Sequence, residues 1–307
     1  MSCPKCGFDA PVAATECGRC GIIFRKFHDA EAGPEPEVFL PASVELVEEE
    51  VADGRIGPRE LRILGFGLVA AIIVYALWPL RMLLSALVTL FHELGHTIAG
   101  WLLGFPSLPA FDFVYGGGFT HMGEFHRSIA FAVFGLFVYL GVTFRQNKKA
   151  LAIIAAVFLV WLFFVTKEWR RELAVAAAGH MMEFILAGIF FYQALSGVGW
   201  RNPDIERPVG AFAAFFVQIH SMHFAWKLMR DPAFLEWYKE GKGGMLMNDL
   251  EVVALDIQIY THSAPGITGV ARMLFVFSFV PITVALIWYF NRRRWHRVMR
   301  ALRTVDA

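Results

Sequence analysis

The chain has 307 residues, of which 57% are hydrophobic, 15% aromatic and only 18% charged. Soluble domains carry about 25% charged residues, so this composition excludes an ordinary soluble protein and indicates an integral membrane protein that crosses the lipid bilayer several times. The net charge of +1, with basic residues scattered in short clusters, gives no reason to expect a nucleic-acid partner.

Four cysteines lie within the first twenty residues: Cys3, Cys6, Cys17 and Cys20. They form two CxxC pairs, each followed by a glycine that permits the tight turn needed to point two thiolates at one ion. Disulfides at this spacing would require an oxidising compartment. We therefore predict a structural zinc ion in a zinc ribbon over residues 1–28 and a cytosolic N-terminus. Recruitment of a cytosolic protein partner by this ribbon is a hypothesis.

An acidic stretch follows, which we predict to be a mobile linker over residues 29–57. Between Asp29 and Gly54 it carries nine acidic residues and no lysine or arginine. Several prolines and a low apolar content leave this stretch little to bury, so we expect it to serve as a spacer.

Apolar runs of about 20 residues, the length that crosses a bilayer, occupy most of the remaining chain. The predicted fold class is an all-α polytopic membrane protein with about six or seven transmembrane helices in a domain over residues 58–292, followed by a basic tail over 293–307. If seven spans simply alternate, the basic clusters cannot all face the cytosol, so one segment is expected to be re-entrant or interfacial. The runs lie at about 61–79, 82–104, 129–144, 150–166, 173–196, 208–226 and 270–290.

The second run begins after a predicted tight turn at residues 78–81 and contains the sequence FHELGHTIAG. On a helix, His92 and His96 lie about 40° apart, so both imidazoles can bind one metal ion. Glu93 projects about 100° away and can reach a metal-bound water. The same motif occurs by chance on solvent-facing helices, but inside a membrane each charged group costs about 2.5–3.5 kcal/mol. We therefore predict a catalytic zinc site with Glu93 as general base.

The segment between the second and third runs, residues 105–127, is rich in glycine and proline. It contains the triplet Gly116, Gly117 and Gly118, and glycines beside a catalytic helix let the backbone approach a ligand closely. Two interpretations remain open. The segment is either a re-entrant hairpin that presents a strand edge to a peptide or an ordinary interfacial loop.

A catalytic zinc ion needs a third protein ligand, and two places in the later chain offer one. In AAAGHMMEF, His180 and Glu183 lie on one face of an apolar helix, so Glu183 is a candidate ligand. In GGMLMNDLEV, Asp249 is the other candidate ligand. His180 and Asn248 are candidates for lining the cavity or supporting the transition state. Asp249 has an alternative role as the plain N-cap of a helix that starts near Leu250.

The FHELGH helix early in an apolar polytopic domain, the glycine-rich segment after it and the late aspartate resemble the site-2 protease class of intramembrane zinc metalloproteases, in particular its short bacterial branch. This resemblance implies that His92, His96 and Asp249 bind zinc. Glu93 then acts as the base, and Glu183 remains the alternative third ligand. The resemblance also implies a location in the plasma membrane of a prokaryote.

The predicted function is that of a zinc metalloendopeptidase that hydrolyses a peptide bond of a membrane-embedded protein substrate in or near the bilayer. Glu93 takes a proton from a zinc-bound water and returns it to the leaving amine. The predicted cofactors are two zinc ions, one catalytic and one in the ribbon. Two other classes stay open: a non-catalytic membrane scaffold whose ribbon recruits a partner, and a metal transporter, because intramembrane histidines and carboxylates also form ion pathways.

Overall fold

A computed structural model describes residues 3, 5–9, 11, 14–23, 56–112, 117–240 and 247–292. The chain divides into two compact units, Met1–Ala52 and Asp53–Ala307. In the first unit an isolated antiparallel bridge joins Glu16 to Ile23, close in sequence to the second cysteine pair. Most of the predicted linker and the predicted basic tail lie outside the described residues.

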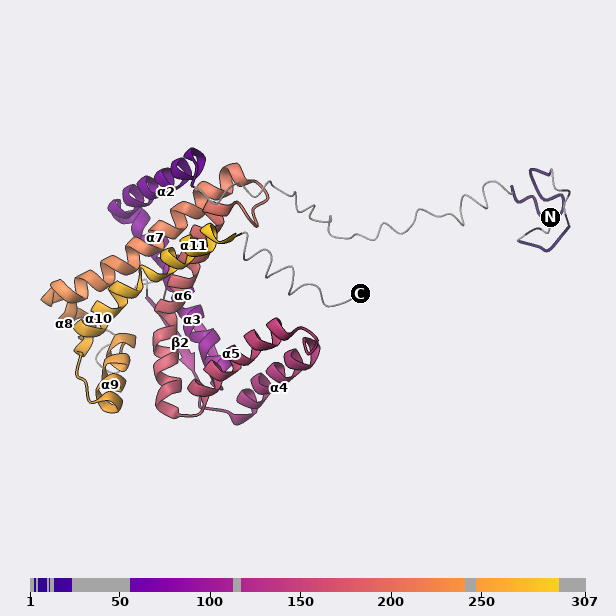
Figure 1. Ribbon diagram of the computed structural model, residues 1–307. Helices are drawn as coiled ribbons and strands as arrows, with labels where there is room; N and C mark the ends of the chain where they lie inside the picture. Colours follow the sequence, from indigo (N-terminus) through magenta and orange to yellow (C-terminus); the bar gives the residue numbers. More distant parts are fainter. Residues whose placement is uncertain are drawn as a thin grey trace. The chain divides into compact units, whose positions relative to one another are not determined.

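The second unit is mostly helical (Figure 1). Its described helices are α2 (Pro58–Ala76), α3 (Trp78–Leu103), α4 (Arg127–Thr143), α5 (Lys148–Val165), α6 (Glu168–Ser196), α7 (Pro203–Arg230), α8 (Pro232–Glu240), α9 (Asp249–Thr261), α10 (Gly266–Phe277) and α11 (Val280–Phe290). Two strands, β1 (Ser107–Asp112) and β2 (Gly117–Met122), follow α3. The α4 and α5 helices lie at one end of this unit, and α8, α9 and α10 gather at the other (Figure 1).

A helix lies at the position of each predicted apolar run, with the last run divided into α10 and α11. By length and composition, four helical segments in the described chain are candidates to cross a membrane: α3, α5, α6 and the segment Gly266–Phe290. The α4 helix is apolar but shorter, and α2 and α7 contain charged residues such as Arg59, Glu60 and Arg207. These findings are compatible with an integral membrane protein, whereas six or seven spans stay a prediction.

The break before the HELGH helix differs from the predicted turn at residues 78–81. Leu77 is in an extended conformation and caps α3, which already begins at Trp78. Pro79 fits the first turn of α3, because the backbone N–H that proline lacks has no partner within a helix at that position. The proline therefore lies in the first turn of the helix that carries HELGH, and the helix begins before the predicted turn ends.

The segment that follows α3 is a β-hairpin. The prediction that this unit is all-α is therefore wrong at this segment. Strands β1 and β2 are antiparallel, with Ser107 paired to Met122 and Asp112 paired to Gly117. Glycines favour this local departure from helix, because they stabilise helices poorly and allow close packing of the strand. Binding of a peptide at an edge of this hairpin stays a prediction.

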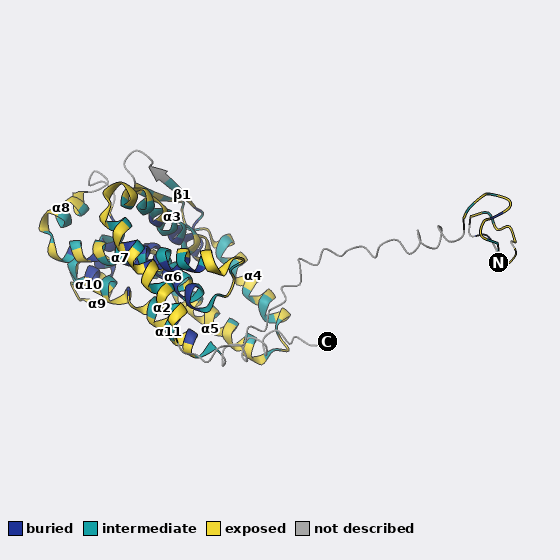
Figure 2. Cartoon of the chain, turned by 90° about the horizontal axis from the view of Figure 1, so that it is seen from above, coloured by how far each residue is buried: buried dark blue, intermediate teal, exposed yellow. Residues whose placement is uncertain are grey.

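Helix α6 is the centre of the second unit, since it packs against α3, α7, α9 and α11. Figure 2 shows buried residues gathered in the middle of the bundle and exposed residues along its outer faces. Large apolar side chains such as Phe66, Phe131 and Val160 are exposed on those outer faces. An apolar outer surface of this kind suits contact with lipid.

A methyl group at Gly67 tests the packing of α2 against α7. Its carbon would lie 2.5 Å from Cβ of Ala211 and 2.8 Å from the Phe212 backbone nitrogen, so Gly67→Ala must push the helices apart. Overpacking costs about 1–3 kcal/mol, and we expect a lower midpoint of thermal unfolding in detergent micelles. Gly65→Ala, in the same helix with no atom within 4 Å of the new carbon, is the matched control. Equal midpoints for the two variants would contradict the close contact.

Candidate metal centre

The HELGH sequence lies within α3, where this helix packs against α6. Glu93 and His96 are buried there, and His92 is partly buried. Helix α6 brings Glu183 to this point, and Asp249 arrives as the first residue of α9. Three helices that are distant in the sequence therefore contribute the ionisable side chains of one cluster.

Three of these side chains bring a potential ligand atom to the same point. Nε2 of His92 lies 2.8 Å from Oδ2 of Asp249. Nε2 of His96 lies 3.2 Å from the same oxygen and 3.0 Å from Nε2 of His92. The three atoms thus form a nearly equilateral triangle.

The second nitrogen of each imidazole has its own partner on α6. Nδ1 of His92 lies 2.7 Å from Oε1 of Glu183, and Nδ1 of His96 lies 2.7 Å from the backbone oxygen of Val175. Both partners only accept hydrogen bonds, so each Nδ1 carries the proton and donates it. In a neutral imidazole this leaves the Nε2 lone pair free, and both lone pairs lie in the triangle.

The triangle fits a metal ion. Two nitrogen lone pairs and an ionised carboxylate oxygen repel one another at such separations unless a proton or a cation lies between them. Atoms at these separations can all lie about 2.0–2.1 Å from one ion, which is the length of bonds from zinc to imidazole and carboxylate. From these distances, the three side chains of the triangle could hold a metal ion, and two histidines with one carboxylate suit zinc.

The N-cap role considered for Asp249 is wrong, because Asn248 caps α9. The backbone N–H of Asn248 donates to Glu251, which completes a capping box. Asn248 also donates its side-chain amide to the backbone oxygen of Tyr238, so its described contacts serve this helix end and not a cavity at the triangle. Asp249 is free to reach the histidines. Partial burial disfavours its charged form, but hydrogen bonds with both imidazoles outweigh that effect and hold the pKa of Asp249 well below its usual range.

Glu183 lies behind His92, on the nitrogen that faces away from the triangle. Its Oε1 accepts from His92 and lies 3.2 Å from Nδ1 of His180, while its Oε2 accepts from the hydroxyl of Ser221 on α7. A looser group made of His92, His180 and Asp249 also offers ligand atoms within 4.8 Å of one another. The triangle with His96 is tighter, and it leaves Glu183 as the partner that orients His92.

Sequence reasoning did not identify Gly179, whose missing side chain makes room for the cluster. A Cβ at this position would lie 2.5 Å from Nε2 of both His92 and His96. On the facing helix α3, a Cβ at Gly95, directly before His96, would lie 2.4 Å from the backbone oxygen of Ala178. The glycine directly before His180 was the available signal, since glycine in an apolar helix often marks close approach.

Glu93 is held on the hairpin side of α3. The hydroxyl of Thr120 on β2 donates to Oε2 of Glu93 across 2.7 Å. Glu93 is 5% exposed, so this carboxylate is almost fully removed from solvent. The predicted base is therefore adjacent in sequence to a ligand of the triangle and has a defined hydrogen-bond partner.

The four cysteines of the first unit also converge. They are free thiols whose sulfurs lie within 4.8 Å of one another, with Cys3 3.6 Å from Cys20 and Cys6 3.7 Å from Cys17. Zinc bonds to sulfur of about 2.3 Å in a tetrahedron separate the sulfurs by about 3.8 Å, so the cluster could hold zinc. Hydrogen bonds from the backbone N–H groups of Arg19 and Cys20 lower the pKa of Cys17 to about 6, which favours a thiolate ligand.

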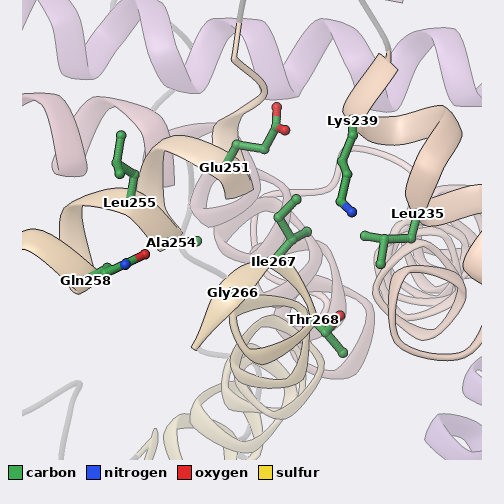
Figure 3. Close-up of a pocket in the computed structure, with 9 residues that line it drawn as sticks. All are labelled: Leu235, Lys239, Glu251, Ala254, Leu255, Gln258, Gly266, Ile267 and Thr268. Carbon is green, nitrogen blue, oxygen red and sulfur yellow. The ribbon is translucent and has the colours of Figure 1, made fainter. Parts of the chain in front are cut away.

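A cavity of about 440 Å³ lies between α8, α9 and α10, apart from the triangle of His92, His96 and Asp249 (Figure 3). Lys239, Glu251 and Ile267 are among the residues that line it. On α9 its lining residues occupy the face opposite Asp249, because residue 251 is rotated by about 200° from residue 249. The cavity is therefore separate from the candidate metal centre.

Comparison of the chain with known proteins gives no match to a protein-family model, a curated protein or a solved structure. No family is shown in this way. The resemblance to the site-2 protease class therefore stays a proposal that rests on this chain's own residues.

Gly179→Ala should remove the metal ion from the triangle. The new methyl group would displace both Nε2 atoms, and we expect the metal content of the purified chain to fall from two ions to one. Gly135→Ala in α4, where the new carbon has no neighbour within 4 Å, is the control and should retain two ions. Elemental analysis measures both contents. Full metal content in the Gly179→Ala protein would contradict the proposed ligand set.

Cys17→Ser should remove the other ion. Because the two sites belong to separate units, their losses should add: each single variant retains one ion, and the Cys17→Ser/Gly179→Ala double variant retains none. The same elemental analysis tests this expectation. Loss of both ions in the Cys17→Ser protein would show that the sites are not independent.

Proposed function

We propose that the second unit is a zinc metalloprotease that hydrolyses peptide bonds in or near the membrane. The observation that carries the proposal is the triangle of His92 Nε2, His96 Nε2 and Asp249 Oδ2, with the buried Glu93 next to one ligand. Two imidazoles and one carboxylate are typical of catalytic zinc, which keeps a position open for water or substrate. This ligand set also supports the resemblance to the site-2 protease class.

The chain's own residues account for binding, orientation and proton transfer. A bound zinc ion supplies Lewis-acid polarisation of the scissile carbonyl and of a water molecule. The oxygen of the attacking water bonds to the carbonyl carbon while Glu93 takes a proton from this water. Glu93 then gives that proton to the amine nitrogen when the C–N bond breaks. Glu183 and the Val175 carbonyl keep both imidazoles oriented during these steps.

We infer that the substrate is a membrane-embedded protein. Both histidines of the triangle and Glu93 lie on α3, which packs against α6, and both helices are candidates to cross a membrane. A hydrogen-bonded substrate helix hides its carbonyl groups, so the substrate must unwind locally before hydrolysis. In this proposal the protein belongs to the plasma membrane of a prokaryote, and its cysteine cluster is a cytosolic zinc ribbon able to recruit a partner.

The alternatives, a metal transporter and a non-catalytic scaffold, differ from a protease in their need for Glu93. A transporter or a structural site requires the ligands but no base beside them. The buried position of Glu93 and its separate partner Thr120 are observations that favour the protease, because this carboxylate contacts neither histidine of the triangle in the described hydrogen-bond network.

Glu93→Gln should retain the metal and lose hydrolysis. We expect two ions per chain but a fall in cleavage of at least about 10²-fold, because the amide cannot accept the proton. The assay uses the full chain in liposomes with a mixture of synthetic transmembrane peptides, and mass spectrometry detects the new N-termini. Glu236→Gln, at an exposed position of α8, is the matched control. Undiminished cleavage by the Glu93→Gln protein would reject the mechanism.

A further inference from the structure

The hairpin after α3 is anchored to the helix that carries HELGH. The indole N–H of Trp101 donates to the backbone oxygen of Ser107 across 2.8 Å, and the Phe105 backbone N–H donates to the Gly100 oxygen across 2.8 Å. At Gly100 any side chain would collide with Ser107. These contacts fix the start of β1 against α3, and the ladder with β1 then fixes β2.

Within this ladder Pro109 is paired with Thr120, and the Thr120 hydroxyl faces Glu93. The hydroxyl oxygen lies 2.7 Å from Oε2 of Glu93 and 3.1 Å from the backbone oxygen of the same residue. That backbone oxygen already accepts a hydrogen bond from Thr97 across 2.8 Å. The shorter, charge-assisted bond therefore takes the single proton of the Thr120 hydroxyl.

Gly118 confines the same carboxylate from a second side. A Cβ at Gly118 would lie 2.6 Å from Cγ of Glu93, 2.8 Å from its Oε1 and 2.8 Å from Cγ2 of Thr89. The strand backbone thus passes directly against the glutamate side chain, which only glycine permits. One carboxylate oxygen is held by a hydroxyl while the other lies against the strand.

We propose that Thr120 is a positioning residue that holds Glu93 in the orientation from which it acts as base. This inference rests on the proposed function. A glutamate has several rotatable bonds, and in a buried site without a donor its carboxylate would turn toward other polar groups. A displacement of about 1 Å costs about 10²-fold in rate, so the hairpin contributes to catalysis by fixing this one side chain.

Thr120→Val and Thr120→Ser are the test pair, since valine keeps the shape without the hydroxyl and serine keeps the hydroxyl. In the liposome assay we expect Thr120→Val to lower kcat by about 10-fold to 10²-fold, with KM within about twofold of wild type and two metal ions retained. Thr120→Ser should recover most of kcat. A purely structural role of Thr120 would not produce this selective rescue with unchanged metal content.

An infrared measurement tests the contact without depending on activity. The difference between spectra of the wild type and of Glu93→Gln isolates the carboxylate stretch of Glu93. We expect this band to shift in Thr120→Val protein and to keep its position in Thr120→Ser protein, because only valine removes the donor.

Two kinetic results would overturn the inference while leaving the protease intact: wild-type kcat in Thr120→Val, or equal loss of kcat in both Thr120 variants. An unshifted carboxylate band in Thr120→Val would overturn it as well. A different result identifies failure of the proposed function itself. If the wild type and Glu93→Gln cleave the peptide mixture equally, or neither cleaves it, the base has no role and the inference falls with it.

Discussion

His92, His96 and Asp249 bring three electron-rich atoms to one point inside an apolar helical unit, at separations of 2.8 to 3.2 Å. Such atoms repel one another, so the arrangement requires a positive charge at its centre. The Nδ1 atoms, which face away from this point, agree with that arrangement. Glu183 and a backbone carbonyl accept the protons on these nitrogens, which leaves the Nε2 lone pairs free. The relative placement of α3, α6 and α9 is therefore inseparable from the electrostatics of the site.

Small residues make this placement possible. In lipid, the hydrophobic effect provides little driving force for helices to associate. Close backbone contact between helices therefore has to stabilise their packing. Gly95 on α3 and Gly179 on α6 allow that contact where the candidate ligands lie. On the other side of α3, Gly118 does the same for the hairpin. The cluster thus lies between two close backbone contacts that limit movement of its side chains.

Ligands a few residues apart are predictable from sequence, because one helix or one tight turn sets the spacing of His92 and His96 and of each cysteine pair. Helix positions are predictable from apolar runs, but the number of membrane crossings is not, because charged residues interrupt some runs. Asp249 remains ambiguous in the sequence, since an aspartate at a helix start suits a cap equally well. The orienting role of Glu183 and the contact of Thr120 with Glu93 depend on tertiary packing, so local patterns do not indicate them.

Asp249 is the first residue of α9, so in the proposed site a bound ion would be linked to a helix end. In the proposed site the carboxylate reaches the histidines only while the first turn of α9, capped by Asn248 and Glu251, is formed. Metal binding and folding of this turn are then thermodynamically coupled. Because such coupling is reciprocal, an ion stabilises the turn, and any force that unwinds the turn weakens retention of the ion. One turn of helix becomes a control point for the occupancy of the whole centre.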